Sequence, residues 1–182
     1  MDKYTPARDI KMKDLGKNSE AFRGLLDLIP VGSVRRVVDV RYGLGGWARE
    51  VHTRFPSAKI IGFERDEATA EQSWKTKNVG LHRTEFNQPV KCDLLVADFN
   101  TVTQLKRSES DFVLGLVTCE WLVFTDVCCS KLHLNYHSYG ISSSDLEAYW
   151  KGYEVKGFEL VAYEKKHHAA SSGLFKRKSP GG

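Results

Sequence analysis

The chain has 182 residues, of which 41% are hydrophobic and 27% are charged. This length and balance predict one globular domain around a single substantial core and exclude two large domains. No run approaches the roughly 20 apolar residues that cross a bilayer, and the first residues lack the apolar segment of a secretory signal. We therefore expect a cytoplasmic protein with no membrane partner.

The net charge is only +4, but it is unevenly distributed along the chain. From residue 165 onward there are basic residues and no acidic ones: Lys165, Lys166, Lys176, Arg177 and Lys178. A local positive charge of this kind favours RNA or DNA as a partner, through a basic C-terminal strand and tail. The alternative is a tail that only keeps the protein soluble.

The cysteines and histidines do not have the spacing of a metal site. Cys128 and Cys129 are adjacent, Cys92 and Cys119 stand alone, and no CxxC pair occurs. We expect buried, reduced thiols rather than a metal site or disulfides. His133 and His137 lie four residues apart in a segment typical of a loop, so we predict no metal site there either.

The first half of the chain alternates helical and strand patterns. Residues 1–17 are predicted to be an arm before one domain at 18–182, whose last few residues are expected to be disordered. A helix begins at Ser19 and ends at Pro30 and Gly32. The next elements are a strand at 35–40, a helix at 47–55, a strand at 58–64, and a helix capped by Asp66 with Ala70 and Trp74 facing inward.

The second half continues the alternation and then changes. It contains predicted strands at 79–85, 92–98 and 121–127, a partly helical stretch at Val102–Val117, and a helix that begins with a capping box of Ser144 and Glu147 and ends at Gly152. Two strands follow, at 157–166 and 173–178, joined by a loop at 168–172 without a helix between them. Two strands connected in this way pair antiparallel.

These elements predict an α/β fold. Apolar strands that alternate with amphipathic helices indicate a doubly wound, mostly parallel sheet with helices on both faces. We expect seven strands, with the C-terminal pair antiparallel at one edge.

The turn after the first strand, from Asp39 to Gly46, is the predicted ligand loop. Ligands of such sheets bind where the first strand passes into its helix, and glycines let the backbone turn tightly and approach a ligand. Glu64 ends the second strand 21 residues after Gly43, as a ribose-binding carboxylate would. The loop also fits the loose G-x-G-x-x-A pattern of dinucleotide-binding proteins. However, Asp39 would repel a pyrophosphate and favour a ligand with a cationic amino-acid end.

The segment VVDVRYGLGG resembles the first motif of the class I S-adenosylmethionine-dependent methyltransferases, an apolar pair, an acid and then G-x-G-x-G. The resemblance covers about 34–178 and implies S-adenosylmethionine as the cofactor. It places Asp39, Gly43, Gly45 and Glu64 in the cofactor site, Glu85 or Asn87 near the adenine, and Asp98 in the fourth-strand motif. Arg41 stands where the family has its first glycine. Its guanidinium could pair with Asp39 or Glu64, or fill part of the groove.

The resemblance also implies that the methyl acceptor lies near the end of the fourth strand. There Asp98 is a candidate base or orienting carboxylate and Asn100 a candidate hydrogen-bonding group; alternatively, Asp98 only caps the next helix. Gly46-Trp47 is similar to the ribose 2′-O-methyltransferases of the FtsJ-like type, which use a Lys-Asp-Lys-Glu set. Asp98 and Lys131 lie in comparable places, whereas Glu164 is a poor positional match and the first lysine could be any of Lys11, Lys13 or Lys17.

The sequence thus predicts an S-adenosylmethionine-dependent methyltransferase that acts on a nucleic acid or another large substrate. Three alternatives remain open. They are a non-catalytic Rossmann-like binding module with an altered groove, an NAD-binding enzyme, and an enzyme that cleaves S-adenosylmethionine.

Overall fold

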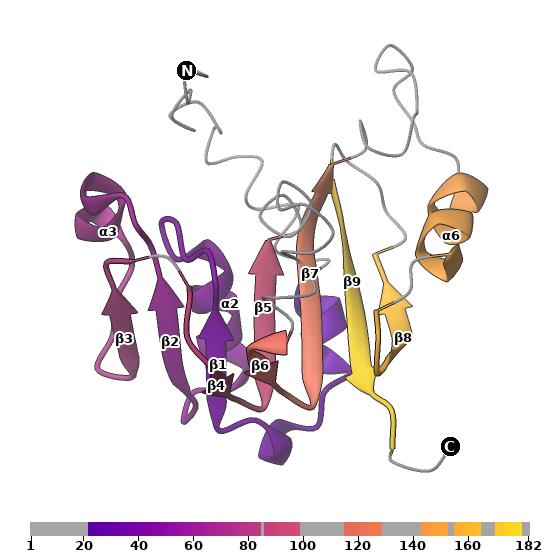
Figure 1. The fold of residues 1–182 in the computed structure, drawn as a ribbon, viewed down its shortest axis with the longest axis horizontal. Coiled ribbons are helices and arrows are strands. Elements are labelled where there is room, and N and C mark those ends of the chain that lie inside the picture. Colours follow the sequence, from indigo (N-terminus) through magenta and orange to yellow (C-terminus); the bar gives the residue numbers. More distant parts are fainter. Residues whose placement is uncertain are drawn as a thin grey trace.

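The protein is built around one seven-stranded sheet (Figure 1). The structure, a computed structural model, describes residues 22–84, 86–98, 115–128, 143–152, 155–164 and 170–179. The strands of this sheet are β1 (Arg36–Asp39), β2 (Lys59–Phe63), β3 (Val79–His82), β5 (Leu94–Asp98), β7 (Trp121–Cys128), β8 (Phe158–Tyr163) and β9 (Ala170–Arg177).

The order of the strands is β3-β2-β1-β5-β7-β9-β8. Strands β1, β2, β3, β5 and β7 pair in parallel, and β9 is antiparallel to both β7 and β8. The chain moves outward from β1 to β3 and then returns to add β5 on the other side of β1. This reversal is the switch point at which open α/β sheets bind ligands. The predicted doubly wound sheet and its antiparallel C-terminal pair are confirmed.

Helices cover both faces of the sheet because successive side chains of a buried strand point to opposite sides. Val37 belongs to the hydrophobic cluster beneath α2 (Gly46–Arg54), and the next residue, Val38, belongs to the cluster beneath α6 (Ser143–Gly152). Trp150 of α6 is fully buried in the second cluster. Each face therefore has its own apolar core.

The helical residues 22–27 complete the layer that contains α2. Phe22, Leu26 and Ile29 are fully buried against the sheet. Arg23 forms a two-pronged ion pair with the buried carboxylate of Glu50 on α2. A bidentate pair of this kind fixes the helix more firmly than apolar contact alone.

A small second sheet lies beside the main one. Strands β4 (Val90–Lys91) and β6 (Val117–Thr118) pair in parallel, and neither was predicted. The partly helical stretch predicted at Val102–Val117 lies outside the described residues except for its last three, of which Gly115 is helical. There, Val117 is in β6 and not in a helix, because it pairs with Val90 and is buried in the core.

Several predicted boundaries were also wrong. The loop predicted at 168–172 includes the start of β9, because Ala170 pairs with the end of β7. Helix α3 (Glu67–Gln72) ends before Trp74, which the sequence had placed inside it. Ser144 lies within α6 rather than at its N-cap. The arm at 1–17 and the start of the first helix lie outside the described residues.

A short 3-10 turn, η1 (Val31–Ser33), leads from the first helix toward β1. Within the described ranges, no helix combines the length and the apolar character needed to cross a membrane.

Candidate cofactor site

The carboxyl ends of the central strands bring acidic residues together at one edge of the sheet. Asp39 ends β1 and pairs in register with Gly62 of β2 and Val96 of β5. Glu64 follows β2 directly, and Asp98 ends β5. Since neighbouring strands lie about 4.8 Å apart, these three positions, which are far apart in the sequence, lie close together in the backbone around the switch point.

The chain that leaves β1 is held by the strands on both sides of it. The backbone N–H of Val40 donates to the carbonyl of Val96 (3.2 Å), and that of Tyr42 donates to the carbonyl of Phe63 (3.0 Å). Gly43 and Gly45 then turn the chain with φ of 54° and 79°. Only glycine adopts this left-handed region without strain, so the two glycines allow the loop to enter α2 at once.

The side chain of Tyr42 packs between the loop and strand β2. Its side chain is 2% exposed and lies against Gly45 and Gly62, where an added Cβ would come within 2.8 Å and 2.2 Å of the ring. Its hydroxyl donates to the carbonyl of Trp74 at 2.6 Å. Burial, together with the nearby Asp39 carboxylate, raises the pKa of Tyr42 well above its usual value. The phenol therefore stays neutral and keeps its hydrogen bond.

The segment after α3 fixes the loop from a second side. The Ser73 hydroxyl donates to the carbonyl of Gly43, and the backbone N–H of Trp74 donates to the carbonyl of Leu44. Asp66 caps α3 by accepting from the N–H of Thr69 (2.7 Å), which confirms the predicted cap. The loop conformation is thus determined before any ligand binds.

Glu64 presents its carboxylate to this loop. One oxygen accepts the N–H of Gly43 at 3.0 Å, and the other accepts the N–H of Asp66 at 2.8 Å. The side chain is half-buried, and each carboxylate oxygen has a second lone pair. The carboxylate is therefore held in one orientation and retains acceptor capacity for a pair of hydroxyls.

Asp39 is the most deeply buried carboxylate of the site, with 2% of its surface exposed. It accepts the backbone N–H of Arg41 at 3.2 Å. Gly43, two residues after Arg41, faces open space, because a Cβ added there would meet no atom within 4 Å. A buried anion beside an open stretch of backbone suits a cationic ligand, which would offset the cost of burying the carboxylate.

The structure describes only some of the remaining predicted site residues. Asp98 is the last residue of β5 and pairs in register with Thr125 of β7. Asn87 is exposed beyond the end of β3. The side chain of Asp98, and the residues Glu85, Asn100 and Lys131, lie outside the described part of the chain, so their assigned roles stay predictions.

Glu164 was the weakest member of the Lys-Asp-Lys-Glu set. It follows β8 and is 6% exposed. Three strand spacings separate β8 from β5, about 14 Å at the usual distance between strands. The strand order is therefore consistent with Glu164 being a poor positional match, and its role stays a prediction.

The sequence analysis missed several residues of this site. Tyr42 and Ser73 hold the loop, but nothing in the sequence pairs them with Gly62 or Gly43. Thr125 is fully buried, and its hydroxyl has no hydrogen-bond partner among the residues in view. The one available signal was that Thr125 and Asp126 are polar residues near the end of a predicted strand whose other residues are apolar.

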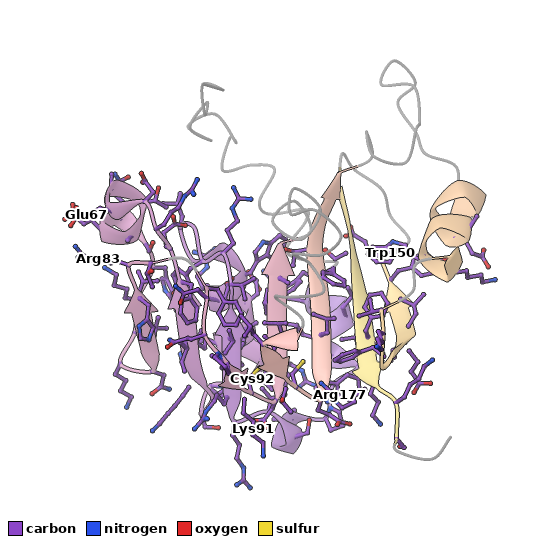
Figure 2. The ribbon with its side chains drawn as sticks, in the orientation of Figure 1. Glu67, Arg83, Lys91, Cys92, Trp150 and Arg177 are labelled. Atoms are coloured by element: carbon purple, nitrogen blue, oxygen red, sulfur yellow. The ribbon has the colours of Figure 1, made fainter. Side chains whose placement is uncertain are left out.

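Two of the cysteines are confirmed as buried, free thiols. Cys92 and Cys119 follow β4 and β6, and their thiols hydrogen bond to each other. That hydrogen bond and burial raise the pKa of Cys92. Figure 2 places Cys92 near the end of the sheet opposite the loop. Within the described ranges, no group of three or more possible ligands could hold a metal ion.

The sequence matches no model of a known protein family and no curated protein. The fold, in contrast, matches solved structures. A candidate O-methyltransferase from Klebsiella pneumoniae superposes with a TM-score of 0.59 and 11% identity, over 96% of this chain and 84% of that one. This chain has the fold of the class I S-adenosylmethionine-dependent methyltransferases.

Two other methyltransferase-fold neighbours support the same assignment of fold. The O-methyltransferase TomG from Streptomyces achromogenes, involved in tomaymycin synthesis and solved with S-adenosylmethionine, gives a TM-score of 0.56 at 12% identity, covering 91% of this chain and 89% of TomG. The fibrillarin chain of a fibrillarin/Nop5p complex gives 0.56 at 14% identity, covering 86% of this chain and 79% of its own length. At such low sequence identities the structural similarity establishes the methyltransferase fold only. The reaction has to be inferred from the residues of the site.

Proposed function

We propose that this protein binds S-adenosylmethionine at the carboxyl edge of its sheet and transfers the methyl group to an acceptor. The observation that carries the proposal is the Glu64 carboxylate, held by Gly43 and Asp66 beside the buried Asp39. One carboxylate is oriented for a ribose, and the other suits a cationic amino-acid end. The complex of TomG with S-adenosylmethionine, on the same fold, supports this choice of cofactor.

The residues present fit this cofactor. Glu64 would accept hydrogen bonds from the ribose hydroxyls, Asp39 would face the ammonium group, and Gly43 would let the backbone approach closely. Arg41 is the one departure, because its backbone N–H serves Asp39 while its side chain stands in place of a glycine. Its positive charge opposes a cationic ligand, so we propose weaker binding than the glycine motif would give.

Bound S-adenosylmethionine supplies an electrophilic methyl group on a sulfonium. The task of the protein is then to hold the acceptor in line with that group and, where needed, to remove a proton. We assign the second task to Asp98, with Asn100 and Lys131 as orienting groups near the acceptor. The position of the end of β5, beside the switch point, supports this placement. The acceptor class that we favour is a nucleic acid or another large substrate.

Calorimetry on Glu64→Ala tests the cofactor site. We expect S-adenosylhomocysteine to bind about 10-fold more weakly, since a stranded polar group costs about 1–3 kcal/mol. Glu71→Ala is the matched control, because Glu71 is an exposed carboxylate on the neighbouring helix and should leave affinity unchanged. Thermal unfolding of both variants checks that the fold is retained.

A ligand that lacks the 2′-hydroxyl separates a direct contact from a loosened loop. If Glu64 binds the ribose, Glu64→Ala should weaken the 2′-deoxy analogue much less than the parent ligand, because the contact is already lost. Equal losses for both ligands would make Glu64 a support of the loop only. Binding of NAD in preference to both ligands would overturn the choice of cofactor.

Product analysis covers the remaining alternatives. A transferase leaves S-adenosylmethionine intact until an acceptor is added, whereas a cleaving enzyme consumes it alone. If the wild-type protein binds neither S-adenosylmethionine nor NAD, the fold serves as a non-catalytic module and the proposal fails.

A further inference from the structure

The amino-terminal edge of the sheet, opposite the cofactor loop, gathers positive charge. Parallel strands all begin at this edge, and the antiparallel β9 ends there. Figure 2 places Lys91 and Arg177 together at this lower end of the sheet. The cationic residues at or next to these strand ends, here called the basic edge, are Arg35, Arg36, Lys59, Lys77, Lys91, Lys156, Lys176, Arg177 and Lys178.

Few acidic residues balance this charge. At the same strand ends the described acidic residues are Asp93, Glu120 and Glu159. The excess of positive charge at this one edge is larger than the net charge of +4 of the whole chain. The rest of the chain is therefore net negative in sum, so the positive charge of the protein is concentrated at this edge.

Among the described residues, no ion pair joins these three acidic side chains to the cationic side chains of the basic edge. Asp93 accepts the backbone N–H groups of Arg35 and Arg36, both at 2.8 Å. Lys59, Lys91, Lys156 and Lys178 are all exposed. Their ammonium groups are thus available to a partner in solution.

The arrangement is a line rather than a cluster. Lys77 precedes β3 at one side of the sheet and Lys156 precedes β8 at the other. Between them, β2, β1 and β9 carry cations at this edge, and Lys91 of β4 lies two residues before Asp93 and β5. Seven strands at about 4.8 Å spacing extend over roughly 29 Å. A line of positive charges of this length matches an elongated polyanion with regularly spaced charges.

The aromatic residues near this edge are covered by cations. Lys176 lies over the ring of Trp121 (5.4 Å), and Arg177 lies over the ring of Phe158 (4.7 Å). Both rings are at least nine-tenths buried. They are unavailable for stacking on bases or for anchoring a protein partner, which leaves charge as the basis of recognition.

We propose that the basic edge binds the phosphate backbone of a nucleic acid, without reading its sequence. This inference goes beyond the proposed methyl transfer and does not depend on it. The sequence analysis predicted a nucleic-acid contact through the C-terminal strand and tail alone. The proposed surface includes the end of that strand and extends to the cations at the amino-terminal ends of other strands. The eight-residue β9 extends about 26 Å from this edge to the other. The bound backbone is therefore an anchor, separate from any acceptor group at the cofactor loop.

Fluorescence anisotropy of the full chain with a labelled single-stranded RNA of about 20 nucleotides, longer than the expected site, tests the proposal. The test variant is the triple Lys59→Gln, Lys91→Gln and Lys178→Gln. The control variant is the triple Arg49→Gln, Arg83→Gln and Lys151→Gln, three exposed cations on α2, after β3 and on α6. Both variants lose the same net charge.

We expect the test triple to bind at least about 10-fold more weakly near 50 mM salt. We also expect the slope of log affinity against log salt to become shallower by about 2, since each lost single-strand phosphate contact removes about 0.7. The control triple should stay within about twofold of the wild type. Calorimetry with S-adenosylhomocysteine should give the same affinity for all three proteins, so a failed cofactor site would be recognised separately.

Three results would overturn the proposal. Equal loss in both triples would mean that net charge, and not this edge, drives binding. If the wild type does not bind RNA even at low salt, the basic edge is not a nucleic-acid-binding surface. Equally tight binding of polyglutamate would show a surface for any polyanion, such as an acidic protein.

Discussion

At the carboxyl edge of the sheet, the carboxylates of Asp39 and Glu64 are hydrogen bonded to the backbone around a tight loop, whereas at the amino edge several lysine side chains are exposed to solvent. Glu64 accepts two backbone N–H groups and Asp39 is almost fully buried. At the amino edge, Lys59 begins β2 and Lys91 ends β4, and both side chains are exposed. One sheet thus carries two charged surfaces with different degrees of order.

This difference separates two kinds of recognition. Buried, oriented charges suit a small ligand with few contacts of fixed geometry, and salt screens them little. Exposed, flexible charges suit a long polyanion whose counterions are released on binding, and salt weakens that binding strongly. The two surfaces should therefore respond differently to the same perturbation.

Ionic strength should separate the two surfaces most clearly. Between about 50 and 200 mM salt we expect RNA affinity to fall about 50-fold, as for about four phosphate contacts. The affinity for S-adenosylhomocysteine should change less than about twofold, because its partners are buried. Anisotropy and calorimetry on one preparation measure both. Parallel losses would mean that the carboxyl edge is as solvent-screened as the amino edge.

Gly62→Ala should disrupt the carboxyl edge alone. Its new Cβ would lie 2.2 Å from the Tyr42 ring, and we expect overpacking to lower the free energy of unfolding by about 2 kcal/mol. Gly80→Ala on the adjacent strand β3 is the control, since a Cβ there meets nothing within 4 Å. Urea unfolding compares the two. The same loss in both variants would show that strand glycines matter here for reasons other than Tyr42.

Tyr42→Phe should change how stability depends on pH. The pKa of Tyr42 is raised in the folded state, so its contribution to stability is present below the unfolded value near 10 and is lost as pH rises above it. The wild type should lose up to about 1.4 kcal/mol per pH unit more than the variant there. At neutral pH the variant should be less stable by about 1 kcal/mol, because the bond to Trp74 is gone.

Tyr163→Phe, at a half-buried tyrosine on β8, is the control for this measurement. Urea unfolding at several alkaline pH values should give it the wild-type slope. If Tyr42→Phe also keeps that slope, the phenol of Tyr42 ionises in the folded protein and the packing beneath the loop is looser than described.

Arg41→Gly should have the smallest effect. It removes a positive charge beside a ligand that is itself cationic, and its backbone N–H can still donate to Asp39. We expect S-adenosylmethionine to bind about fivefold more tightly, or about 1 kcal/mol. Calorimetry on this variant, with Arg49→Ala on the exposed side of α2 as control, measures the change. Weaker binding would instead make the guanidinium a ligand contact.

Local patterns were sufficient to predict most of the sheet. β-branched runs such as the one around Val37 and Val38 form strands because both of their faces are buried, and the absence of a helix before β9 predicted its antiparallel pairing. The motif at Asp39–Gly46 and its distance to Glu64 located the loop. These features depend on neighbours in the sequence, so the sequence alone contains them.

Other features depend on residues that meet only in the folded chain. The pairing of β4 with β6 places Val117, the last residue of a stretch predicted to be partly helical, in a strand. The fit of Tyr42 between Gly45 and Gly62 requires two segments to be brought together.

The amino-acid sequence by itself determined the class of fold and the position of the glycine loop after β1 with Asp39 and Glu64 beside it, because each is encoded in a local pattern or a fixed spacing. Only the tertiary structure decided how that loop is held and that cations from β1, β2, β3, β4, β8 and β9 lie along one edge. Both depend on strand order, which aligns the ends of segments that are distant in the chain. Long-range pairing of this kind leaves no periodic signal in the sequence.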